Sequence, residues 1–338
     1  MNRIYIILVT ILLSLTFFSC QSIRIIEIET INPSVVTFPQ DVKTVMIVNN
    51  SAQQPDNIGH SSLGPRVVDT LRSVSADSMA YIYCMALGKA LIGSPRFDDV
   101  RMCDDTLRRD SSFYRVRPFT FADVETFCSD YGVDALISLD KLFAETIFFD
   151  SRNNVNSAIS VEISGELRVF WPGQKEVYTI PVSDSLNWYS TYDSELLLES
   201  DVRIAMLYLS EHMGREAHVN FVPHWSDDQR WYYTNMSSEW KSGTAYVRAE
   251  KWAEAINIWE PLYNKANKWK HKAKLSSNIA LCYEMISDLG KAIKYAEFSY
   301  DLFKENDKED SPYTNLQNLY IESLKKRKDA DMTLSKQF

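Results

Sequence analysis

Apolar and polar residues in the first half of the chain follow two periodicities in turn. Runs of β-branched and other apolar residues over 42–48, 97–103 and 133–139 predict strands. Apolar residues at helical spacing over 75–91 and 120–131 predict two helices, the second opened by a capping-box sequence. Strands that alternate with helices need crossover connections, so we expect a sheet with helices packed on it.

The following segments change to alternation of apolar and polar residues, which is typical of half-buried strands. These segments span 143–149, 158–171 and 176–182, with turn-forming residue pairs between them. They predict an antiparallel meander. A helix is expected next over 194–212, where apolar residues recur at helical spacing.

The last third of the chain carries a repeated helical pattern. Small and aromatic residues fall at the same offsets in two stretches, at Gly243, Tyr246, Ala255 and Trp259 and again at Ala280, Tyr283, Ala292 and Ala296. This pattern resembles the tetratricopeptide repeat, a helix–turn–helix unit of about 34 residues. The resemblance implies helical pairs stacked side by side. A third, degenerate pair over 314–327 and 329–335 is expected to cap the stack.

The first domain also resembles a known group of envelope domains. An early apolar strand, a long helix and the sequence from Tyr131 to Ile137 (Tyr-Gly-Val-Asp-Ala-Leu-Ile), entering a strand, carry the resemblance. It is to the small α/β domain of periplasmic lipoproteins related to the curli secretion lipoprotein, the TolB amino-terminal domain and the penicillin-binding-protein activators. It covers roughly residues 42–190 and implies a location in the cell envelope.

The first twenty residues have the pattern of a secretory signal. Arg3 precedes an uncharged apolar stretch, and Ser19 stands directly before Cys20. The stretch is shorter than the roughly 20 residues of a bilayer-spanning helix, which favours a signal over a retained membrane helix. Leu15 to Cys20 resembles the lipobox of Bacteroidota lipoproteins, which implies cleavage before Cys20 and acylation of its thiol. A plain cleaved signal is the alternative.

These patterns predict an α+β protein, with an N-terminal α/β domain that contains a strand meander and an all-α tetratricopeptide-like repeat domain. The expected segments are a signal peptide (1–19), a lipid-anchored tether (20–41), the α/β domain (42–192), a connecting helix with an aromatic junction (193–235) and the helical repeats (236–338). The chain is 45 % hydrophobic and has a net charge of −9, so we expect a globular protein that does not bind nucleic acid.

The candidate chemistry is sparse. The histidines do not share a metal-binding spacing, and no nucleophile–base or phosphate-binding motif is present in the sequence. We therefore expect no metal, no cofactor and no enzymatic activity. Four cysteines other than Cys20 could pair in an oxidising compartment, but each lies in an apolar segment, so buried thiols are favoured: Cys84, Cys103, Cys128 and Cys282.

Aromatic residues gather near the expected domain junction. Trp225, Arg230 and Trp231 belong to one such cluster. The cluster could be a stacking platform for sugar or peptide, or a buried seam where the repeats pack on the first domain. The seam is favoured, in which case truncating Trp225 should destabilise the protein by about 3 kcal/mol.

Helical repeats bind other proteins through the concave surface of the stack. On that surface we expect Lys241 and Arg248 in one helix and Asn278 in the next to face an envelope protein partner. The expected function is a non-catalytic scaffold or activator. Acylated Cys20 is expected to anchor it in the outer membrane, facing the periplasm. The alternative is a glycan-binding lipoprotein that uses the aromatic cluster.

The anchor gives a first prediction. Cys20→Ala should release the protein from membranes into the soluble envelope fraction, because the acyl chains on Cys20 supply the attachment. Fractionation followed by a carbonate wash measures this. Retention of the variant in the washed membranes would contradict the lipoprotein assignment.

Overall fold

The computed structural model describes residues 23–63, 74–103, 107, 112–149, 157–190, 195–307 and 311–338, so the expected signal peptide and Cys20 lie outside the described residues. The chain forms two compact units. One contains Ser34–Pro223, and the other combines the described residues up to Pro33 with His224–Lys336. Both units mix strands and helices, and helices dominate the C-terminal part, which confirms the α+β class.

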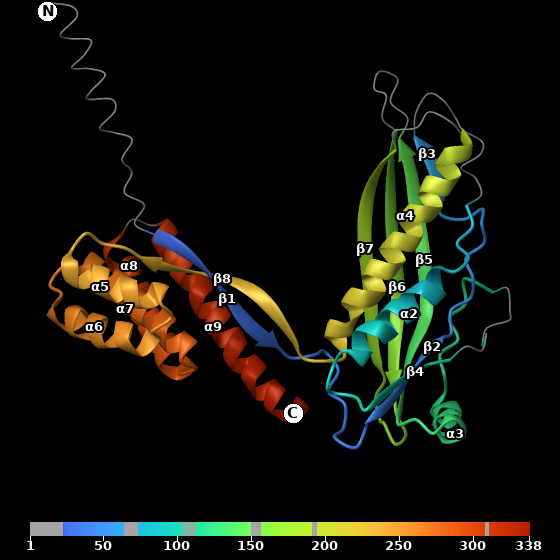
Figure 1. Ribbon diagram of the computed structural model, residues 1–338, viewed down its shortest axis with the longest axis horizontal. Coiled ribbons are helices and arrows are strands. Elements are labelled where there is room, and N and C mark those ends of the chain that lie inside the picture. Colours follow the sequence, from blue (N-terminus) through green and yellow to red (C-terminus); the bar gives the residue numbers. More distant parts are fainter. Residues whose placement is uncertain are drawn as a thin grey trace, which may run out of the picture. The chain divides into compact units, whose positions relative to one another are not determined.

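The unit formed by 34–223 is built on a mixed sheet (Figure 1). The strands are β2 (Thr44–Asn49), β3 (His60–Leu63), β4 (Asp99–Met102), β5 (Ala135–Phe149), β6 (Ser157–Phe170) and β7 (Tyr178–Ser190). Their order is β4-β2-β5-β6-β7, and β3 pairs with the distal part of β5. The pairs among β2, β3, β4 and β5 are parallel, whereas β5, β6 and β7 form the expected antiparallel meander.

Helices cover both faces of this sheet. Val45 and Ile47 belong to the core shared with α2 (Met79–Ile92) and α4 (Glu195–Glu216). The intervening Met46 and Val48 face α3 (Phe121–Tyr131) on the other side. Successive side chains of a strand point to opposite faces, so an uninterrupted apolar strand is what a sheet covered on both faces requires. A short 3₁₀ helix, Ala217–Asn220, follows α4.

β5 corrects one expectation. The segments 133–139 and 143–149 were expected as separate strands, yet a single strand runs through both, with a bulge between Leu139 and Lys141. The extra residue in the bulge is Asp140, whose buried carboxylate accepts hydrogen bonds from Ser138, Asn50 and Arg168. A bulge breaks the alternation without ending the strand, which explains why the pattern suggested a boundary there.

The second unit contains a strand where a tether was expected. β1 (Ile23–Asn32) pairs antiparallel over its whole length with β8 (His224–Tyr233). The segments 20–41 and 193–235 are therefore not simply a tether and a junction. We call the pair the β1–β8 ribbon. The sequence did not predict this ribbon, because residues 34–223, which form the α/β unit, separate the two strands along the chain.

Helices make up the rest of this unit, which we call the helical unit. They include the pairs α5 (Ser238–Arg248) with α6 (Trp252–Lys265), and α7 (Trp269–Met285) with α8 (Leu289–Asn306). The first pair is in close contact, since a Cβ built on Gly243 would lie 2.2 Å from Nε1 of Trp259. Ala280, Ala292 and Ala296 are likewise fully buried. Small residues thus stand where the helices approach, as the repeat pattern predicted.

The expected third pair is wrong, because α9 is one continuous helix over Pro312–Gln337. Ser311 caps its first turn and Pro312 occupies a first-turn position. The sequence between 327 and 330 has no glycine or proline to end a helix, so the helix continues.

The cysteine thiols are buried, as expected from the apolar segments around them. The predicted burial of Cys84, Cys103, Cys128 and Cys282 is confirmed, and no disulfide joins them. Burial raises the pKa of the Cys128 thiol to about 11 and that of Cys84 to about 12. Within the described ranges, no helix is both long and apolar enough to cross a membrane.

The packing of α2 on α4 gives a second prediction. A Cβ on Gly214 of α4 would lie 2.2 Å from the backbone oxygen of Tyr83 in α2. Gly214→Ala should therefore lower the free energy of unfolding by about 1–3 kcal/mol, although alanine normally favours a helix. Urea denaturation measures this.

Gly93→Ala is the matched control. Gly93 has a φ of −72°, and its added Cβ would meet its nearest neighbour at an ordinary 3.5 Å. We expect this change to stay within about 0.5 kcal/mol. Equal losses of stability in the two variants would show that the close approach of α2 and α4 at Gly214 does not exclude a Cβ there.

Candidate functional site

The β1–β8 ribbon has an unusual inner face. Side chains alternate in burial along β8: Trp225, Asp227 and Gln229 are exposed, and the residues between them are partly or fully buried. The inward set is nevertheless polar, consisting of His224, Ser226, Asp228 and Arg230. The inner face of a strand is normally apolar, so a polar inner face needs a structural or functional reason.

The polar face lines a cleft of about 750 Å³ between the ribbon and α9, which run alongside each other in Figure 1. We call this space the ribbon cleft. Its lining is Thr30, Ile31, Asn32, Pro33, His224, Ser226, Asp228 and Arg230 from the ribbon segments, and Ser323, Lys326, Arg327, Asp329, Ala330 and Thr333 from α9.

Hydrogen bonds across the two strands fix the polar side chains of the ribbon. Thr30 donates from Oγ1 to Oδ2 of Asp228 at 2.9 Å. Asn32 donates from Nδ2 to the hydroxyl oxygen of Ser226 at 2.7 Å. Because β1 and β8 are in continuous register, these groups are held in fixed positions along the cleft.

A buried carboxylate lies behind the cleft. Glu284, at the end of α7, has no exposed surface. It accepts hydrogen bonds from Nε and Nη2 of Arg230 at 3.0–3.1 Å, and from Nη1 of Arg327 at 3.0 Å. The hydroxyl of Tyr320 donates to Oε2 at 2.9 Å. The carboxylate thus joins β8, α7 and α9.

Burial and the charge of Glu284 shift the pKa values of two members of this cluster, Arg230 and Tyr320. Burial acts to lower the pKa of Arg230, but the hydrogen bonds and the charge of Glu284 outweigh it and raise that pKa. Burial and, next, the negative charge of Glu284 raise the pKa of Tyr320 well above its ordinary value. Arg230 therefore stays charged, and Tyr320 stays a hydrogen-bond donor.

Asn278 corrects the expected partner-binding surface. It was expected to face a groove, but it is fully buried. Its Oδ1 accepts from the backbone N–H of Tyr233 at 2.6 Å, and its Nδ2 donates to the backbone oxygen of the same residue at 2.8 Å. Trp240 of α5 donates to that oxygen as well. The surface of α7 that was expected to bind a partner is thus occupied by β8.

The aromatic cluster is divided by the structure. Trp225 is 67 % exposed, so the expected buried seam is wrong at this residue, and its truncation should cost little stability. Trp231 is partly buried, with its ring centroid 5.4 Å from that of Tyr320. Arg230 belongs to the buried cluster around Glu284. The three residues are close in sequence and were therefore predicted to form one cluster, but each has a different environment.

Lys241 and Arg248 are both exposed on α5. They lie seven positions apart, which is two helical turns, so they share one face. Among the described residues neither forms an ion pair. They do not line the ribbon cleft, so the expected binding residues do not converge on one site.

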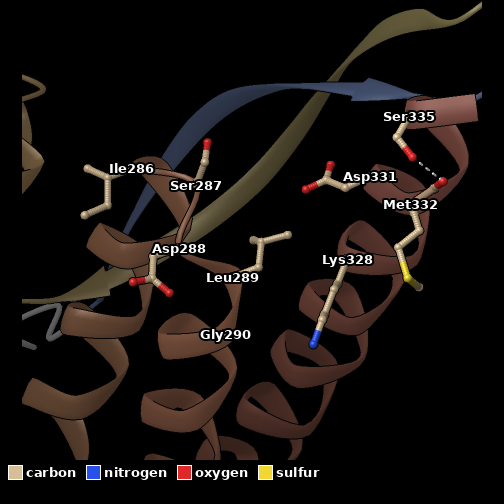
Figure 2. A pocket seen from close by; sticks show the side chains of 9 residues that line it. All are labelled: Ile286, Ser287, Asp288, Leu289, Gly290, Lys328, Asp331, Met332 and Ser335. Atoms are coloured by element: carbon tan, nitrogen blue, oxygen red, sulfur yellow. Dashed lines mark hydrogen bonds between the residues drawn. The ribbon is translucent and has the colours of Figure 1, made fainter. Parts of the chain in front are cut away.

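A second depression in the helical unit is less suited to binding. Figure 2 shows the α7–α8 turn at Ile286–Leu289 facing Lys328, Asp331 and Met332 of α9. Its volume is about 560 Å³. Asp288 caps α8 by accepting from the backbone N–H of Lys291, and Ser335 donates to the backbone oxygen of Met332. These polar groups thus already serve the ends of their helices.

Glu284, Tyr320 and Arg327 were missed by sequence reasoning. One signal was present: Glu284 directly follows the apolar run 279–283 in the middle of a helical pair. A charged residue on a buried helix must have a partner, and that partner could have been sought among the arginines.

The buried cluster gives a third prediction. Glu284→Ala should lower the free energy of unfolding by about 3–5 kcal/mol, because it removes the buried carboxylate that bonds to the guanidinium of Arg230 and leaves it only the partly exposed Asp228 at 3.6 Å. Glu297→Ala is the control, since Glu297 pairs at 3.4 Å with Lys325 on the surface. That change should cost at most about 1 kcal/mol. Comparable losses in thermal or urea unfolding would show that the cluster is not a stability centre.

Comparisons with solved structures give weak likenesses. A minor lipoprotein from Acinetobacter baumannii is 10 % identical, with a TM-score of 0.24, over 54 % of this chain and 97 % of that chain. A hypothetical protein from Chlamydia trachomatis is 11 % identical, with a TM-score of 0.25, over 52 % of this chain and 98 % of that chain. No curated protein matches the sequence.

Family comparisons divide the chain between two domains. Residues 241–326, which cover the helical pairs from Lys241 onward and the first part of α9, match the family described as domain of unknown function DUF6340. Residues 42–233 match a second family, which extends through the α/β unit to the last residue of β8. Since this match spans more than half of the sequence, the chain belongs to the family described as domain of unknown function DUF8603.

Proposed function

We propose that this protein is a non-catalytic envelope lipoprotein that binds another envelope protein through its helical unit. The sequence up to Cys20 supports the anchor, and outer-membrane attachment facing the periplasm fits the residues that follow it. The paired helices α5 to α8, which resemble tetratricopeptide repeats, support a protein-binding role.

The exposed cationic face of α5 is the observation that carries the proposal. Lys241 and Arg248 lie two turns apart and make no ion pair within the described part of the chain. Because β8 covers α7 around Asn278, the partner contacts α5 from outside rather than the inner surface of the helical pairs.

Charge defines the partner's chemistry. A lysine and an arginine on one helix face attract an acidic segment or a terminal carboxylate, and arginine can bind a carboxylate with two hydrogen bonds. The attraction between exposed charges weakens with salt, with a screening length of about 8 Å at physiological ionic strength. Partner binding is therefore expected to be salt-sensitive.

A second candidate function rests on Trp225. Its ring is 67 % exposed on the ribbon, where it could stack on a sugar ring. Trp231 does not contribute in the same way, because it packs against Tyr320. This candidate is a glycan-binding lipoprotein in which Trp225 contacts the ligand.

The scaffold gives a fourth prediction. Lys241→Glu with Arg248→Glu should leave the melting temperature unchanged and abolish capture of the partner, because like charges then face the acidic segment. Co-purification from native envelopes, compared between wild type and the double variant, measures this. Circular dichroism establishes equal folding beforehand.

Lys265→Glu with Lys268→Glu is the matched control. Both lysines are exposed near the α6–α7 connection, and their reversal makes the same change in net charge away from the α5 face. This control should retain the captured proteins. The same set of proteins in all three samples would remove the α5 face from consideration, and loss in both variants would indicate an effect of net charge alone.

A further inference from the structure

The ribbon cleft has a balanced set of charges. Its lining contributes the cations Arg230, Lys326 and Arg327 and the anions Asp228 and Asp329. The buried carboxylate of Glu284, which bonds to both arginines, supplies a third negative charge. A ligand with a large net charge therefore gains little from this site over water.

Hydrogen-bonding groups, by contrast, are dense in the cleft. Hydroxyl and amide side chains are contributed by both walls: Thr30, Asn32, Ser226, Ser323 and Thr333. Donors and acceptors thus lie within one concave space, together with the charged groups. Thr30, Asn32 and Thr333 already donate to neighbouring groups, but their hydroxyl oxygens and the amide group of Asn32 keep bonding capacity that a ligand with both donors and acceptors can use.

These polar groups are held in place before any ligand arrives. Arg230 is only 5 % exposed, and Glu284 fixes its guanidinium. Asn32 and Thr30 are fixed by their bonds to Ser226 and Asp228. Fixed groups lose little conformational freedom on binding, which favours affinity for a polar ligand.

The size and the apolar parts of the lining also match a ring-shaped polar molecule. The volume of about 750 Å³ lies in the range of small-molecule sites, roughly 300–1,000 Å³. Ile31, Pro33 and Ala330 add apolar surface, on which the C–H face of a sugar ring can pack.

From these observations we infer that the ribbon cleft binds a neutral oligosaccharide, with its hydroxyl groups bonded to the polar side chains of the ribbon and of α9. This site is separate from the α5 face, so the inference does not rest on the proposed function. It is also separate from Trp225, which does not line the cleft.

The experiment is titration calorimetry on the full-length protein in detergent. The neutral probes are tri- and hexasaccharides of glucose, mannose, xylose and N-acetylglucosamine, and trigalacturonate is the anionic comparison. At least one neutral probe is expected to bind. Asn32→Ala and Ser323→Trp, which remove a polar group and fill the cleft respectively, should each weaken that probe at least tenfold.

Lys325→Ala is the control, because it removes an exposed cation next to Lys326 that does not line the cleft. It should retain the affinity within about twofold. Trp225→Ala is not a control but separates the cleft from the exposed ring of the ribbon as the place where the sugar binds. All four variants are compared only if their melting temperatures match wild type.

Four results would overturn the inference. They are failure of every neutral probe to bind wild type, unchanged affinity in both cleft variants, loss of binding in Trp225→Ala, and tighter binding of trigalacturonate than of any neutral probe. The third would assign the sugar to the exposed ring, and the last would make the cleft an anion site.

Discussion

The helical unit depends on one buried carboxylate. Glu284 receives hydrogen bonds from β8 through Arg230 and from α9 through Arg327 and Tyr320, so a single charge joins three elements. Burying these ions costs several kcal/mol each, and only complete pairing offsets that cost. The pairing therefore specifies position: β8 and α9 must both be in register with α7 for every donor to reach the carboxylate. Asn278, which binds both backbone groups of Tyr233, imposes the same register on the strand.

The strand whose register is fixed in this way, β8, pairs with a strand that is far from it in the sequence. β1 pairs with β8 along its length, and the complete α/β unit is inserted between these strands. The entropic cost of closing a loop rises only slowly with its length, so the insertion is tolerable for stability. It is less tolerable for the rate of folding, because pairings distant in sequence form slowly. The α/β unit has its own core on both sheet faces, and neither core contains a residue of the ribbon.

Local signals predicted most of the elements but not their long-range partners. The capping box at Thr120, the meander and the close packing at Gly243 follow from neighbouring residues, and the structure contains all three. The β1–β8 ribbon could not be predicted, because β1 is isolated in sequence from its partner. The polar inner face of β8 also removed the usual signal of an inward strand face. The prediction for Asn278 was wrong for a related reason. A polar residue on a helix is expected to be exposed, unless the backbone groups to which it bonds are known.

The position of β1 in the sequence has a mechanical consequence. β1 begins at Ile23, and only Gln21 and Ser22 separate it from Cys20. Each residue spans at most about 3.6 Å, so an acylated Cys20 would hold the ribbon within roughly 10 Å of its attachment point. An anchor this short would restrict tumbling and keep the helical unit in the layer next to the lipid headgroups. Membrane-bound ligands and partners would then meet this unit by diffusion in two dimensions, at a high local concentration.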